Sequence, residues 1–136
     1  MAENAIIQAI DGQQWLDPAA DAVQGAVSGA FELAGAAGQA IKNALNGTWL
    51  GHPLHPVMTD IPIGAWTAAL VLDAMDGSCN SAALARGAKI SVAVGLAGAA
   101  GSAITGLTDW SDTDGRPRKV GLLHGLLNVT ATVLYT

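Results

Sequence analysis

The sequence is poor in the residue types that most often build a catalytic or cofactor site. Its 136 residues include one cysteine, one phenylalanine, one tyrosine and four tryptophans, and only 12% of them are charged. That charged fraction is roughly half of what a typical soluble domain carries. Because Cys79 is the only cysteine, an internal disulfide framework is excluded, and so is a zinc ribbon or iron–sulfur cluster ligated by cysteines of this chain alone.

Basic patches and targeting signals are missing as well. The formal net charge is −5, and the Lys and Arg residues are scattered rather than gathered in the stripe that follows a phosphate backbone, which excludes nucleic acid as an expected partner. The N-terminus, MAENAIIQAIDG, has neither the basic start nor the long apolar run of a secretory signal. We therefore expect the start of the chain to stay in the cytoplasm.

No catalytic motif is apparent. There is no serine in a Gly-x-Ser-x-Gly elbow, and Cys79 lies in a stretch of ordinary turn residues. The glycines of 94–101 match neither a dinucleotide-binding nor a Walker pattern. The sequence leaves enzymatic activity open, and a metal-dependent enzyme is the least favoured of the functions considered below.

The sequence is instead rich in long runs of apolar residues. Of its residues 51% are hydrophobic, and they gather in three runs, 57–75, 88–107 and 120–136, separated by turn-forming segments at 76–81 and 112–117. As a helix, the first run rises about 28 Å, close to the thickness of the bilayer hydrocarbon. We predict an all-α helical membrane bundle with about three spans in contact with the lipid bilayer. Purification without detergent as a monodisperse monomer would contradict it.

Residues 1–47 predict a separate amphipathic helical region. A helix is expected from Pro18 to Asn46, with Asp17 as its N-cap, and its charged positions exclude a clean membrane span. This region should lie on the membrane surface or on the rest of the domain, residues 48–136. More cations are expected on the side of the N-terminus, namely Lys42, Arg116, Arg118 and Lys119, than on the opposite side, namely Arg86 and Lys89. The positive-inside rule then places the N-terminus in the cytoplasm.

The second run carries a signal for helix packing. Small residues recur in it at four-residue spacing and form a ridge that another helix can approach closely: Ser91, Gly95, Ala99 and Ala103. Trp49, Trp66 and Trp110 are expected to anchor the chain at the interface or to pack, and of these Trp66 should be the buried one.

Two of the three histidines stand in Gly51-His52-Pro53-Leu54-His55-Pro56, directly before the first run. The prolines favour extended backbone at the residues before them, so His52 and His55 should sit on a stiff loop suited to ligating a metal or haem. The alternatives are that the prolines only separate two helices, or that the histidines relay protons. Asp60 is expected to cap the helix that begins before Pro62 rather than to act as a ligand.

His124 lies in the third run, four residues before Asn128. Alternating topology should bring all three histidines to one membrane surface, so His52, His55 and His124 are the candidate metal or haem ligands. His124 should ligate a haem or hydrogen-bond to Asp60 or Asp109. Asp60, Asp109 and Asn128 are the residues expected to orient those ligands.

These motifs resemble the bacterial membrane domain family DUF2231. The resemblance covers roughly residues 48–136 and rests on three stretches, Gly51–Pro56 followed by Asp60–Gly64, Gly106–Trp110, and Gly121–Asn128. It implies a four-helix membrane domain, so the end of the third helix and all of the fourth would be missing from this chain. Many relatives have a histidine where this chain has Asp60, which weakens a bis-histidine haem site but leaves a non-haem metal site open.

In some members of that family the domain precedes a Rieske-type iron–sulfur domain, whose cluster ligands are absent from this chain. The resemblance therefore implies a domain of the bacterial inner membrane that anchors, and exchanges electrons with, a redox partner, using haem or iron as the candidate cofactor. The competing hypothesis is a purely structural membrane anchor or assembly subunit without a cofactor. A second copy of the chain is a further candidate partner.

Overall fold

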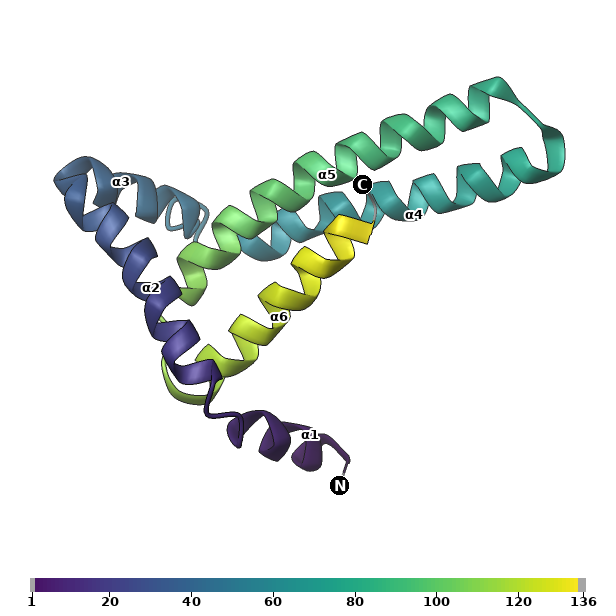
Figure 1. The fold of residues 1–136 in the computed structure, drawn as a ribbon. Coiled ribbons are helices and arrows are strands. Elements are labelled where there is room, and N and C mark those ends of the chain that lie inside the picture. Colours follow the sequence, from purple (N-terminus) through teal and green to yellow (C-terminus); the bar gives the residue numbers. More distant parts are fainter. Residues whose placement is uncertain (1, 135–136) are drawn as a thin grey trace.

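The computed structural model describes residues 2–134, and every regular element in that range is helical (Figure 1). The all-α prediction is therefore confirmed. Six helices follow one another along the chain: α1 (Ala2–Asp11), α2 (Leu16–Leu33), α3 (Gly35–Leu45), α4 (His55–Cys79), α5 (Ala82–Trp110) and α6 (Gly115–Leu134).

Helices α4 and α5 form a long antiparallel hairpin that dominates the molecule (Figure 1). They contain 25 and 29 residues and rise about 38 and 44 Å, more than the hydrocarbon core of a bilayer. Only Asn80 and Ser81 separate them, a shorter turn than the predicted 76–81. Asn80 adopts the left-handed conformation, with φ 49°, and the Ser81 amide donates to the Asp76 carboxylate.

The two helices approach so closely because α5 presents glycines to large side chains of α4. A Cβ added at Gly98 would lie 2.5 Å from Ile61 Cγ2 and 2.9 Å from Pro62 Cδ, distances that real Cβ atoms do not reach. The same relation recurs along the seam, in the pairs Gly87 with Leu72, Gly95 with Trp66, Gly101 with Met58, and Gly106 with His55. Van der Waals contact at this distance is what holds helices together where lipid surrounds them.

The predicted ridge on the second run coincides with this seam over part of its length. Gly95 is buried, Ser91 and Ala99 are half-buried, and Ala103 is exposed. A strict four-residue spacing drifts about 40° per step around a helix of 3.6 residues per turn, so its last member leaves the contact. The buried positions alternate between spacings of three and four instead, as in Gly95, Gly98, Ser102 and Thr105.

On the outer surface of the hairpin, large apolar side chains of α4 and α5 point away from the contact between the two helices. Ile63 is 62% exposed, Leu70 67% and Ile90 58%. Small residues inside and large apolar residues outside are the arrangement expected of membrane helices, since so large an apolar surface is rarely left open to water. Among the described residues, α4 and α5 are the helices long and apolar enough to cross a membrane.

Helix α6 coincides with the third predicted span, whose residues 135–136 lie outside the described range. Its first turns carry Arg116, Arg118 and Lys119, and over its described length it does not reach the apolarity of α4 and α5. It packs against α1, α2 and the end of α5, and it has no buried residue of its own.

The expected single helix from Pro18 to Asn46 is wrong. The chain breaks at Gly35, whose φ of +56° only glycine adopts easily, and α2 and α3 fold against each other (Figure 1). Gly38 allows the close contact, because a Cβ there would lie 2.0 Å from the Phe31 carbonyl oxygen. Asp17 is not the cap either, since α2 begins at Leu16 and Asp17 lies in its first turn.

Two expectations about the start of the hairpin are also wrong. Helix α4 begins at His55, with Pro56 in its first turn, so His55 is helical rather than extended. Asp60 therefore lies inside α4 and caps nothing. Pro62 is interior too, and it removes the hydrogen bond to the Met58 carbonyl. The helix continues because the buried proline ring packs against Gly98, which has no side chain to displace it.

We expect Gly98→Ala to destabilise the hairpin by about 1–3 kcal/mol, because the added methyl group collides with Ile61 and the rigid ring of Pro62. Gly77→Ala is the matched control, since Gly77 is an exposed helical glycine of α4 with open space around it. It should leave stability unchanged or raise it by up to about 1 kcal/mol. Thermal unfolding in detergent compares the two, and equal effects would contradict the packing described.

Candidate functional site

Of the three histidines, His55 is the one that packs against a neighbouring helix. It stands at the first position of α4, half-buried against Gly106 of α5, and its Nδ1 lies 2.9 Å from the Ser102 carbonyl oxygen. Because a carbonyl oxygen only accepts hydrogen bonds, Nδ1 carries the proton. In the neutral ring, Nε2 is then the nitrogen with a free lone pair, the form that ligates metals or accepts a proton.

Polar groups of α5 surround this imidazole. Thr105 Oγ1 lies 3.5 Å from Nδ1 and also donates to the Ser102 carbonyl at 3.1 Å. Asp109 lies one turn beyond Thr105 on α5 and is half-buried. The position of the His55 ring depends on Gly106, because a Cβ there would lie 2.7 Å from the ring. A role of Asp109 in orienting this ring stays a prediction.

His52 and His124 lie apart from this cluster. His52 is exposed in the turn before α4, with its Nδ1 3.0 Å from the Pro53 carbonyl oxygen. His124 is exposed on α6. Asn128 Nδ2 lies 3.0 Å from the His124 Nε2 and donates to the backbone carbonyl of His124 at 2.8 Å. Asn128 is thus the partner of His124 in the structure, rather than Asp60 or Asp109. Asp60 is exposed on α4.

The candidate ligands do not form a metal centre in one chain. Within residues 2–134, no three His, Cys, Asp or Glu side chains come together in a way that could hold a metal ion. A centre using His52, His55 and His124 together does not fit this geometry. What fits is a single ligand from His55, with its tautomer held by the Ser102 carbonyl.

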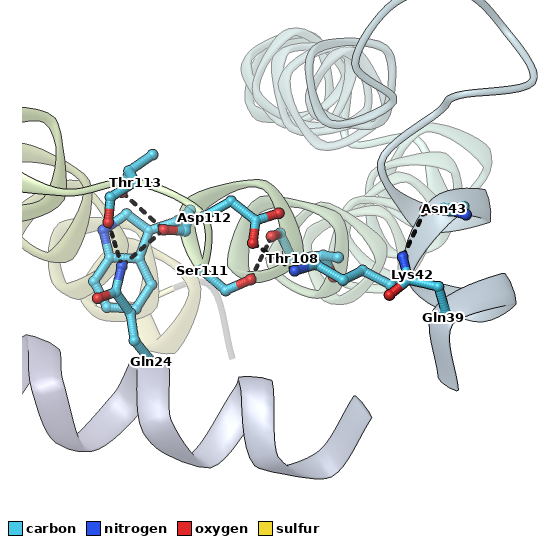
Figure 2. Close-up of polar contacts among 9 residues, drawn as sticks. Gln24, Gln39, Lys42, Asn43, Thr108, Ser111, Asp112 and Thr113 are labelled. Carbon is cyan, nitrogen blue, oxygen red and sulfur yellow. Dashed lines mark hydrogen bonds and ion pairs between the residues drawn. The ribbon is translucent and has the colours of Figure 1, made fainter. Parts of the chain in front are cut away.

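A second polar cluster, which the sequence did not predict, ties α2 to the turn between α5 and α6. Gln24 of α2 donates to the carbonyl oxygens of Trp110 and Thr113 at 3.0 and 2.8 Å (Figure 2). The Trp110 indole donates to the Arg118 carbonyl at 2.8 Å and packs on Gly121, where a Cβ would lie 2.3 Å from the ring. Gln24 gave no signal in sequence, because glutamine is common on helix surfaces.

Trp110, and not Trp66, is consequently the most buried of the three tryptophans considered above. It is 9% exposed, whereas Trp66 is half-buried and Trp49 is 68% exposed. Trp110 is buried because its ring fills the corner between two helices that only the turn at 111–114 brings together. Position in the sequence alone could not show this.

Ion pairs extend the same junction to the N-terminal helices. We call these four ion pairs the clamp. Each joins one of the helices α1–α3 to the base of α6 or to the turn before it: Asp11 with Arg116, Asp17 with Lys119, Asp21 with Arg118, and Lys42 with Asp112. Arg118 also donates to the Asp17 carbonyl, and Lys119 to the Asp11 carbonyl. Lys42 reaches Asp112 from α3 (Figure 2). The clamp sets α1–α3 at the end of the hairpin where His55 lies.

A sequence model of the family described as predicted membrane protein (DUF2231) matches residues 51–136. The match begins one residue before His52 and includes α4, α5 and α6, so the helices joined by the clamp lie partly inside and partly outside it. Comparisons with curated proteins and with solved structures gave no significant match.

We expect Arg118→Gln to loosen the clamp, because it removes the ion pair with Asp21 and weakens the bond to the Asp17 carbonyl. A partly exposed ion pair contributes about 1 kcal/mol or less. If the contacts that hold α1–α3 to the base of α6 lose about 1 kcal/mol, the fraction of molecules in which these contacts are open rises roughly fivefold. Limited proteolysis in the loop at 12–15 measures that fraction. Arg86→Gln, at the opposite end of the hairpin, is the control, and equal cleavage of both variants would refute the clamp.

Proposed function

The chain belongs to the DUF2231 family of predicted membrane proteins, and on that premise we propose that it is a membrane anchor which holds a partner at the bilayer surface. The observation that supports an anchor is the α4–α5 hairpin, with glycines at its seam and exposed Ile, Leu and Val side chains around it. We divide the chain into an N-terminal helical region, residues 1–47, and the membrane domain, residues 48–136.

We assign the anchor to the bacterial inner membrane with the N-terminus in the cytoplasm. Lys42, Arg116, Arg118 and Lys119 all take part in the clamp at one end of the hairpin. Arg86 and Lys89 lie in the first turns of α5, at the other end. This asymmetry supports the orientation, since positively charged residues next to spans favour the cytoplasmic side.

Helices α1–α3 are the surface offered to the partner. They stand at the cytoplasmic end of the hairpin, outside the residues that the family model matches, and the clamp holds them there. We propose a redox protein with a Rieske-type domain as the partner, because the family resemblance associates such domains with this membrane domain. The iron–sulfur cluster would belong entirely to that partner, since this chain lacks its cysteine ligands.

Electron exchange through the anchor itself is a second candidate function, and one observation favours it. The His55 ring is oriented by the Ser102 carbonyl, and its Nε2 can ligate a haem iron or another metal. A bound haem would supply a one-electron carrier at the surface where the partner docks.

The orientation is tested with the native thiol. Cys79 is exposed at the last position of α4, at the end of the hairpin opposite the clamp. We expect a membrane-impermeant maleimide to label Cys79 in intact cells. A Cys79→Ser variant carrying Ser28→Cys in α2 should react only after the cells are opened. The reverse pattern would overturn the orientation, and release of the protein by an alkaline wash would overturn the anchor.

Iron content and the absorption spectrum, measured on the same sample of membrane-extracted protein, decide between the two candidates. A pure anchor should be colourless and free of stoichiometric iron. A Soret band that His55→Ala abolishes and His52→Ala retains would establish the redox role and identify His55 as a ligand. A band that survives in His55→Ala would exclude His55 as an essential ligand.

A further inference from the structure

An apolar groove lies between the N-terminal helices and the last turns of α5. It has a volume of about 210 Å³, and its walls come from three helices: Val27, Ala30 and Phe31 of α2, Leu45 of α3, and Ile104 and Leu107 of α5. Thr108 completes the lining, and its hydroxyl donates to the Ile104 carbonyl at 2.8 Å. These side chains therefore offer apolar surface to whatever fills the groove.

The α5 wall of the groove is continuous with the lipid-facing surface of the hairpin. Ile104 and Leu107 line the groove and are also exposed. Ile90 and Val94 are exposed further along α5, and Ile90, Val94 and Ile104 lie within about 80° of one another around the helix axis. Hydrocarbon that covers this face of α5 therefore extends into the groove.

The groove lies at the boundary between the headgroups and the acyl chains. Helix α5 rises about 44 Å, so each of its ends extends about 7 Å beyond a hydrocarbon core of about 30 Å when the helix is centred in the bilayer. Leu107 and Ile104 stand three and six residues before Trp110, the last residue of α5. They are thus about 4.5 and 9 Å from its end, on either side of that boundary.

The groove has a polar end and an apolar end. Lys42 stands three residues before Leu45 on α3, Asp112 stands four residues after Thr108, and the two form an ion pair at this end of the groove (Figure 2). Asp112 lies beyond the end of α5, whereas Ile104 lies inside the helix. The charged end therefore faces the membrane surface and the apolar end faces the bilayer interior, the same order as the headgroup and chain of a phospholipid.

We propose that an acyl chain of a surrounding phospholipid occupies this groove, with its glycerol and phosphate at the end formed by Lys42 and Asp112. Apolar cavities stay free of water and take up hydrocarbon, and a helix about 10 Å across does not fit a groove of this volume. The chain joins α2 and α3 to the hairpin through apolar contacts, beside the ion pairs of the clamp. The inference rests on the proposed anchor, because α5 must cross the bilayer.

Photolabelling of the full chain in vesicles tests the groove. The vesicles consist of phosphatidylglycerol and phosphatidylethanolamine, with a trace of phosphatidylcholine that carries a photoreactive diazirine in the middle of one acyl chain. After irradiation, labelled residues are identified by mass spectrometry. We expect label on residues 27–31 of α2 and on Leu45 of α3, in addition to the outer surface of α4 and α5.

Filling the groove should exclude the lipid. Ala30→Phe places a ring in it and should remove most of the label from Leu45, while α4 and α5 keep theirs. Ala26→Phe is the matched control, because Ala26 is an exposed residue of α2 one turn earlier and outside the groove, so Leu45 should stay labelled. Ile104→Trp, which fills the groove from the α5 wall, repeats the test should the Ala30→Phe chain not fold.

Two results would overturn the lipid groove. Label on α4 and α5 with none on residues 27–31 and Leu45 would mean that protein covers the groove. Label on Leu45 that both filling variants leave unchanged would mean that α3 meets lipid elsewhere. Absence of label from α4 and α5 as well would contradict the proposed anchor, so the two failures are distinguishable in one preparation.

Discussion

The arrangement of the whole molecule depends on the contact between the glycines of α5 and the large side chains of α4. Gly95 receives the Trp66 ring and Gly98 receives Pro62 and Ile61, so the two backbones approach closely along most of their length. Lipid gives no hydrophobic drive for two helices to associate, and dense van der Waals packing must supply the stabilisation. The same contact seats His55 on Gly106, which means that the position of the candidate ligand follows from the packing of the hairpin.

The N-terminal helices are joined to this hairpin by different forces. Ion pairs and hydrogen bonds connect α1–α3 with the turn after α5 and the base of α6. Leu16 and Ala20 are the buried apolar residues of α2. Such contacts are weaker and depend more on salt than the glycine seam does. A closely packed membrane hairpin thus carries a helical region on weaker, salt-dependent contacts.

Much of the fold could be predicted from the sequence, and the failures have identifiable causes. The long apolar runs predict α4 and α5 because a helix is the simplest way to satisfy the backbone in lipid. The start of α4 was misplaced because Pro56 and Pro62 both fit a first turn, and only the contact of Pro62 with Gly98 shows that the helix continues through it. The partner of His124 was predicted to be Asp60 or Asp109, whereas the structure pairs it with Asn128 on the same helix. The prediction failed because the surroundings of His124 depend on the direction of α6.

The sequence by itself determined the helical class and the membrane character, since composition and run length are properties of the chain alone. Only the tertiary structure decided which small residues form the seam, that Trp110 rather than Trp66 is buried, and that Asp60 faces away from the hairpin. These depend on the rotation of each helix about its axis. That rotation is set by the fit of one helix surface against another, and a pattern along one chain does not contain it.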